Sequence, residues 1–155
     1  MRVQLLAVGG KMPSWVQEGY AEYAKRLPKD LTPKLVEIEL GYRPKQGGIE
    51  TAKKAEAQAI LAAIPSDHFV VALEVLGKAW STPELSENLE DWRMRGLDVT
   101  FIVGGPDGLA DACVQRANAL WSLSPLTLPH PLVRIVFIEQ LYRAWTILQN
   151  HPYHK

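Results

Sequence analysis

Five short apolar runs alternate along the chain with five longer segments of helical periodicity. The runs are rich in valine, isoleucine and leucine and span residues 3–8, 34–40, 68–73, 98–103 and 121–123. The helical segments that follow them span residues 14–27, 49–64, 82–95, 111–120 and 132–150. Because a repeated strand–helix unit pairs its strands in parallel, the sequence predicts an α/β fold with a single parallel sheet layered by helices. A chain of 155 residues corresponds to one domain.

Two of the helical segments begin with signals for helix capping. Ser14 with Gln17 three residues later matches the capping box, in which each residue's side chain bonds the backbone N–H of the other. Thr82 precedes Pro83, a residue favoured at the first helical position, so Thr82 is predicted to cap the third helix. Gly96 is typical of the C-terminal end of a helix.

The strongest candidate for a ligand site lies in the last third of the chain. The apolar run 98–103 leads directly into the glycine turn Gly104–Gly108. The segment 121–131 follows and carries three prolines, each of which removes a backbone donor and stiffens the chain. Open α/β sheets bind ligands at the carboxyl ends of their strands. The pattern therefore predicts a crevice for a flat, mostly apolar ligand whose polar contacts come from backbone groups.

Other nucleotide-site and metal-site patterns match less well. Gly9-Gly10 follows a strand and precedes a helix, but it lacks the third glycine and the acidic residue of a dinucleotide fingerprint. The Gly104–Gly108 turn lacks the Gly-Lys-Ser/Thr of a phosphate loop. His151 and His154 are three residues apart, yet Pro152 lies between them and no cysteine or carboxylate cluster completes a zinc shell, so no metal site is predicted. A hydrolase triad also lacks an anchor, because no Gly-x-Ser-x-Gly elbow occurs.

The closing helix and the tail after it carry further chemistry. Glu139 and Arg143 are four residues apart on one helix face, which at the least predicts a surface ion pair. The helix has more apolar surface than one sheet contact needs, which favours a subunit interface. The tail Asn150–Lys155 combines aromatic, imidazole and cationic groups, the chemistry that holds an unstacked base against a phosphate. The simpler alternative for this tail is a frayed terminus.

Composition bounds the class of protein. Apolar residues make up 47% of the chain and charged residues 22%, as in soluble globular proteins, and no apolar run is long enough for a membrane helix. The start of the chain lacks the features of a signal peptide. The single cysteine, Cys113, excludes an internal disulfide and fits a reducing cytoplasm. The net charge of zero gives no general indication of nucleic-acid binding.

Four motifs in order along the chain resemble the ribosomal large-subunit pseudouridine methyltransferase H family of the SPOUT class. They are Gly104-Gly105-Pro106-Asp107-Gly108, Leu123-Ser124-Pro125-Leu126-Thr127-Leu128-Pro129-His130, Glu139-Gln140-Leu141-Tyr142-Arg143-Ala144 and Asn150-His151-Pro152-Tyr153-His154. The likeness extends over the whole chain. It implies a single SPOUT methyltransferase domain over residues 1–155 without an appended RNA-binding domain, and a homodimer. It also implies a C-terminal trefoil knot, which strand and helix patterns alone do not predict, because chains ordinarily avoid knots.

The resemblance implies S-adenosyl-L-methionine as the cofactor and no metal. The cofactor positions of the family fall on Leu73, Gly104, Leu123, Ser124, Pro125, Leu126, Thr127 and Leu128. The implied reaction is methylation of N3 of a pseudouridine in helix 69 of 23S rRNA, with assembled 70S ribosomes as the substrate. A partner of that size supplies much of the binding surface itself, which agrees with the zero net charge.

The reaction assigns roles to the residues at the end of the chain. The attacking ring nitrogen loses a proton, so a nearby cation or base promotes the step. We expect Arg143 to stabilise the resulting anion and His154 or Tyr153 to orient the base or accept its proton. Glu139 is expected to position Arg143 or to act on the base itself. The tail is expected to meet the cofactor pocket of the other subunit. A binding module without chemistry and a nucleotide hydrolase are the competing classes, although no catalytic carboxylate or metal cluster supports the second.

Overall fold

One five-stranded sheet forms the centre of the computed structural model, which describes residues 1–155. Its strands are β1 (Val3–Val8), β2 (Lys34–Ile38), β3 (Phe69–Ala79), β4 (Val99–Val103) and β5 (Ala119–Ser122). They lie in the order β2-β1-β4-β3-β5, and every neighbouring pair is parallel. The predicted single parallel sheet is therefore confirmed.

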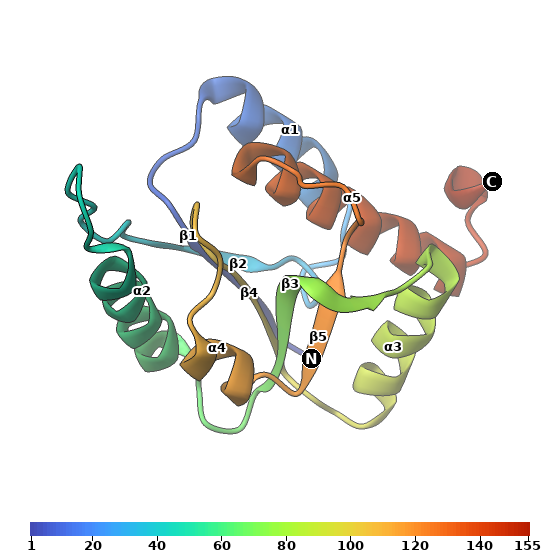
Figure 1. The fold of residues 1–155 in the computed structure, drawn as a ribbon. Helices are drawn as coiled ribbons and strands as arrows, with labels where there is room; N and C mark the ends of the chain where they lie inside the picture. Colours follow the sequence, from blue (N-terminus) through green and yellow to red (C-terminus); the bar gives the residue numbers. More distant parts are fainter.

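Helices cover both faces of the sheet (Figure 1). They are α1 (Ser14–Ala24), α2 (Ile49–Ala63), α3 (Thr82–Met94), α4 (Asp111–Arg116) and α5 (His130–Leu148), with a 3-10 turn η1 at Pro152–His154. The helices α1, α3 and α5 lie on one face and α2 and α4 on the other. Side chains of β1 alternate between the two cores, with Leu5 in the first and Leu6 in the second. Burial on both faces explains why β1 is a continuous apolar run.

The connections of β1 and β4 run in opposite directions across the sheet. The chain leaves β1 towards its outer neighbour β2, whereas it leaves β4 and crosses β3 to reach the opposite edge strand β5. The carboxyl ends of β1 and β4 lie side by side, with Ala7 paired to Val103. Such a topological switch point is where open α/β sheets place a ligand.

The starts of two helices differ from the sequence prediction. Ser14 is the first helical residue of α1 and caps nothing; instead, the Gln17 side chain donates to the carbonyl of Met12 at 2.6 Å. Ser81, and not Thr82, caps α3, because its hydroxyl accepts from the backbone N–H of Glu84 at 3.2 Å. The hydroxyl of Thr82 donates to the side chain of Gln140 on α5 at 2.7 Å. The Thr82 hydroxyl, which the local sequence pattern predicted to cap the helix, thus forms a tertiary contact instead.

Element boundaries also shift around β5. The third strand was predicted to end at Leu73, but β3 continues to Ala79 through an irregularity in its register with β5 between Leu73 and Lys78. The helix α4 ends at Arg116 instead of residue 120, because β5 already begins at Ala119. No helix has both the length and the apolar character that crossing a membrane requires.

Candidate active site

A pocket of about 870 Å³ opens at the switch point, and its volume suits a small organic ligand. Its walls come from the carboxyl ends of β1, β4 and β5, from the middle of β3 where its register with β5 shifts, and from the segments that follow β1, β2, β4 and β5. The lining residues are Val8, Gly9, Gly10, Met12, Leu40, Leu73, Glu74, Val75, Val103, Gly104, Gly105, Pro106, Gly108, Leu109, Ser122, Leu123, Ser124, Leu126, Thr127, Leu128, Pro129, His130 and Val133. Most of this wall is apolar side chain or glycine backbone, as the sequence predicted.

Seven of the eight predicted cofactor positions line this pocket. They are Leu73, Gly104, Leu123, Ser124, Leu126, Thr127 and Leu128, whereas Pro125 is not among the lining residues. Sequence reasoning missed Gly9, Gly10 and Leu40 as pocket residues, whereas His130 lies in the segment 121–131 that it assigned to the crevice. The glycine pair did carry a signal, since it directly follows a buried strand, but it was weighed only as a dinucleotide fingerprint.

Backbone geometry shapes the two segments that form the core of the pocket. A side chain on Gly104 would place its Cβ 2.5 Å from the carbonyl carbon of Gly108, so only glycine fits there. In the second segment, the Ser122 hydroxyl donates to the carbonyl of Ser124, and the Ser124 hydroxyl accepts from the N–H of Leu126 at 2.9 Å. The serine side chains therefore fold this segment onto itself and fix its path through the pocket wall.

His130 stands at the first turn of α5 and contributes a polar group to the pocket. Its Nε2 accepts a hydrogen bond from Nε of Arg134 at 3.1 Å. Arg134 is only 3% exposed; its Nη1 lies 3.0 Å from a carboxylate oxygen of Glu37, while its Nη2 has no partner within the chain. Burial, followed by the charge of Arg134, lowers the pKa of His130, and the backbone of Gly104 and Glu37 offset this in part. The imidazole is therefore neutral at physiological pH.

The predicted catalytic residues form a second cluster at the other end of α5. One carboxylate oxygen of Glu139 accepts from Nε of Arg143 at 2.9 Å and from the hydroxyl of Tyr153 at 3.0 Å. The other oxygen accepts from the side chain of Gln140 at 2.7 Å. The ring of Tyr153 also packs on that of Tyr142 with a centroid distance of 4.6 Å. The tail thus folds back onto α5 as η1, and the frayed-terminus alternative is wrong.

The electrostatics of this second cluster differ from residue to residue. The hydrogen bond that Arg143 donates to the carboxylate of Glu139 raises the pKa of Arg143. Burial, followed by the hydrogen bond to Glu139, raises the pKa of Tyr153 to about 12, so the phenol keeps its proton near neutral pH. Nδ1 of His154 is buried and has no hydrogen-bond partner within the chain. Of the four candidates, His154 alone leaves a buried polar atom for another molecule to satisfy.

The pocket and the catalytic cluster are well separated within one chain. None of Glu139, Arg143, Tyr153 and His154 lines the pocket. Arg143 follows His130 by thirteen residues in the same helix, which corresponds to about 20 Å at the helical rise of 1.5 Å per residue. Within a single chain, the predicted cofactor positions therefore lie together. The catalytic candidates lie together as well, but away from the cofactor positions.

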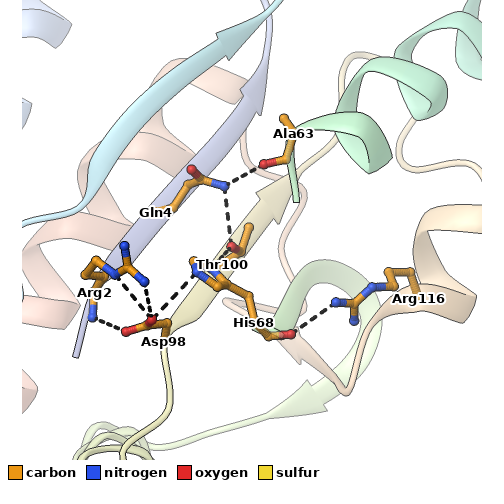
Figure 2. Close-up of polar contacts among 7 residues, drawn as sticks. All are labelled: Arg2, Gln4, Ala63, His68, Asp98, Thr100 and Arg116. Carbon is orange, nitrogen blue, oxygen red and sulfur yellow. Dashed lines mark hydrogen bonds and ion pairs between the residues drawn. The ribbon is translucent and has the colours of Figure 1, made fainter. Parts of the chain in front are cut away.

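Other polar groups lie at the opposite, amino end of the sheet (Figure 2). Arg2 binds Asp98 through its backbone N–H at 2.7 Å and through its guanidinium group at 3.0 Å. The buried His68 bonds Thr100 at 2.9 Å, and Arg116 donates to the carbonyl of His68 at 3.1 Å. These bonds tie the beginnings of β1, β3 and β4 to one another. No group of three or more His, Cys, Asp or Glu side chains lies close enough to hold a metal ion.

The family model described as "Predicted SPOUT methyltransferase" matches residues 1–154 of this chain. A protein of Hahella chejuensis named "Ribosomal RNA large subunit methyltransferase H" is 60% identical over 155 residues, which cover 100% of this chain and 99% of that protein. A protein of the same name from Marinomonas sp. is 57% identical, with 100% of each chain covered.

Solved structures share the fold at low sequence identity. The structure of TrmJ from Z. mobilis has a TM-score of 0.56 and 14% identity, and the match covers 94% of this chain and 71% of that one. The structure of a probable methyltransferase from Bordetella pertussis also has a TM-score of 0.56 and 14% identity, with 92% and 93% of the two chains covered. These likenesses agree with the single parallel sheet that the sequence predicts.

Proposed function

Because this chain belongs to the SPOUT methyltransferase family, we propose that it methylates N3 of a pseudouridine in helix 69 of 23S rRNA on assembled ribosomes. Methyl transfer to ribosomal RNA from S-adenosyl-L-methionine follows at the coarser level from the family and from relatives at 57–60% identity over the full length. The observation that carries the finer proposal is the full-length likeness combined with a glycine-walled apolar pocket at the switch point.

The pocket residues fit the proposed cofactor. The flat, apolar adenine ring suits walls made of Leu73, Leu123 and Leu128, and the glycine backbone of the 104–108 turn can approach its polar edge closely. When bound, S-adenosyl-L-methionine supplies a methyl group on a positively charged sulfur. His130 is neutral, so it offers a polar contact in this pocket without adding a positive charge of its own.

The cluster at the end of α5 fits the handling of the base. N3 of a pseudouridine lies between two carbonyl groups, so its proton is mildly acidic and the anion that remains is the nucleophile. Arg143 keeps its positive charge and stabilises that anion. Glu139 has donors on both oxygens, which favours a positioning role for it. The raised pKa of Tyr153 favours orientation of the base by its hydroxyl and leaves His154 as the proton acceptor.

The separation of the two clusters supports a homodimer. About 15 Å of helix lies between Val133, the last pocket residue on α5, and Arg143, which favours a site that takes the two from different subunits. We therefore infer that the tail of one subunit completes the pocket of the other. Apolar side chains such as Leu126 and Leu76 are largely exposed beside the pocket in the single chain, and a second copy would cover them.

The ribosomal context completes the proposal. A trefoil knot formed by the segments around the pocket would fix the cofactor loops, and it stays a prediction from the resemblance. The assembled ribosome offers a shaped surface to a protein of zero net charge, so a few cations around Arg143 and Lys155 suffice for docking. Work on ribosomes implies the cytoplasm as the compartment.

The experiment is transfer of labelled methyl from S-adenosyl-L-methionine by the purified protein. The substrates are 70S ribosomes, 50S subunits and naked 23S rRNA, all from cells lacking this gene. We expect label only in 70S ribosomes, and a reverse-transcription stop next to one pseudouridine, because an N3 methyl group blocks base pairing. Cofactor bound without S-adenosylhomocysteine formation on any substrate would instead indicate a binding module. Label at another atom or in naked RNA alone would overturn the proposed substrate.

A further inference from the structure

One arginine links the segment after β2 to the glycine turn after β4. Nε of Arg43 donates to a carboxylate oxygen of Asp107 at 2.7 Å. Its Nη1 donates to one oxygen of Glu56 on α2 at 2.6 Å and its Nη2 to the other at 3.3 Å. Nη1 also donates to the carbonyl of Gly41 at 3.0 Å. A single guanidinium group therefore joins three separate parts of the chain, and we call these four contacts the Arg43 clasp.

The Arg43–Glu56 part of the clasp is largely shielded from water, whereas the Asp107 side chain is partly exposed. Glu56 is 3% exposed and the Arg43 side chain 18%. Burying a charge pair costs free energy unless every polar atom of the pair is hydrogen-bonded. In the Arg43–Glu56 pair, all three guanidinium nitrogens and both carboxylate oxygens have partners. The oxygen of Glu56 that binds Nη1 also accepts from the backbone N–H of Gly41 at 2.9 Å. The hydrogen bonds to Glu56 and then to Asp107 raise the pKa of Arg43 above its already high ordinary value.

The clasp lies directly behind the wall of the cofactor pocket. A Cβ on Gly105 would lie 2.9 Å from a methyl group of Val8, and 3.4 Å from both a carboxylate oxygen of Glu56 and a methyl group of Leu40. Leu40 and Gly105 both line the pocket. The glycine turn therefore packs between Val8 of β1 and the clasp. A movement of the turn away from Arg43 would break the bond between Arg43 and Asp107.

We propose that Arg43 is a positioning residue for cofactor binding, because through Asp107 it holds the Gly104–Gly108 turn in the shape that the pocket requires. The inference rests on the proposed cofactor but assigns residues that the cofactor positions do not include. Arg43 and Glu56 do not line the pocket, and Asp107 does not line it either. Their effect on the ligand therefore runs through the backbone of the turn.

Asp107 is the member of the clasp that can be removed without leaving a buried charge unpaired. In Asp107→Ala, Arg43 keeps its bonds to Glu56 and Gly41, so the fold is retained. We expect the dissociation constant for S-adenosyl-L-methionine, measured by calorimetry, to rise roughly tenfold, as the loss of one charge-assisted bond implies. Asp107→Glu, whose longer carboxylate still reaches Arg43, should recover most of the affinity. Asp111→Ala is the matched control, because it removes the same charge from an exposed site nearby.

A second measurement needs no cofactor. Hydrogen exchange of the backbone amides at positions 104, 105, 107 and 108 should be faster in Asp107→Ala than in the wild type, with the strands unchanged. A double replacement, Arg43→Met with Glu56→Met, removes the whole clasp without an unpaired charge, and adding Asp107→Ala to it should weaken binding no further. Unchanged affinity and unchanged exchange in Asp107→Ala would overturn the proposal. Failure of the wild type to bind the cofactor would instead overturn the proposed function, and exchange would still test the clasp.

Discussion

Arg134 holds His130 in one protonation state: its Nε donates to Nε2 of His130 at 3.1 Å, one helical turn away on α5. An imidazole nitrogen that accepts a hydrogen bond carries no proton, so the proton of the neutral ring is on Nδ1. The guanidinium is fixed in turn by Glu37 at the end of β2. Two elements of the fold, α5 and β2, thus determine the polarity of one pocket residue.

The lowered pKa of His130 predicts a pH-dependent stability. The unfolded chain takes up a proton on this residue below a pH of about 6.5, the ordinary pKa of histidine, whereas the folded chain does so only at lower pH. Stability from this residue is therefore present above pH 6.5 and is lost as the pH falls. His130→Gln should flatten the decline in unfolding free energy between pH 7 and 5.5, measured by urea denaturation. His151→Gln, on the exposed tail, is the control, and an equal decline in both variants would contradict the prediction.

Asp98 predicts a second pH dependence, in the acid range. The bond from the backbone N–H of Arg2, with the Arg2 side chain adding to it, lowers the pKa of Asp98. A carboxylate whose pKa is lower in the folded chain stabilises it above a pH of about 4, and this contribution is lost as the pH falls further. Asp98→Asn should lower the free energy of unfolding by about 1 kcal/mol at pH 7. The difference from the wild type should shrink towards pH 3 in thermal or urea denaturation; a constant difference would count against this role.

The fold was largely predictable because its signals are local. Buried strands such as β1 and β4 are continuous apolar runs, and the helices between them show their own period. The errors arose where distant contacts decide. The hydroxyl of Thr82 bonds Gln140, a residue 58 positions away, and Ser81 caps the helix instead. The extension of β3 beyond Leu73 depends likewise on pairing with β5.

The site was predictable only in part, for the same reason. The glycine turn and the segment 123–128 carry their own sequence signals, and both line the pocket. The link from Glu37 through Arg134 to His130 joins residues almost a hundred positions apart, and no local pattern marks it. The Arg43 clasp spans a similar reach from Arg43 to Asp107. Such contacts exist only once the sheet has brought the strand ends together.

The tail should matter for catalysis and not for cofactor binding. His154→Ala is expected to reduce the turnover number on 70S ribosomes at least tenfold by removing the proposed proton acceptor, with the dissociation constant for S-adenosyl-L-methionine unchanged. Tyr153→Phe keeps the ring against Tyr142 but loses the bond to Glu139, so it should lower the turnover number by a smaller factor. Single-turnover methyl transfer and calorimetry measure the two quantities. Unchanged turnover in His154→Ala would remove that residue from the mechanism.

The proposed site shared between two subunits predicts rescue between two inactive variants. Gly104→Ala should destroy the cofactor pocket, because its Cβ would lie 2.5 Å from the backbone of Gly108. Arg143→Ala leaves the pocket intact and removes the cation at the far end of α5. A heterodimer of the two, purified through different tags, contains one intact pocket that faces one intact tail.

The heterodimer should therefore recover about half of the wild-type activity on 70S ribosomes, since one of its two sites is complete. Each homodimeric variant should be inactive in the same assay. If pocket and tail of the same subunit worked together, the heterodimer would also be inactive, because each chain would carry one defect. Recovery thus requires that Arg143 of one subunit act at the pocket of its partner, which the roughly 15 Å of helix between Val133 in the pocket and Arg143 leads us to expect.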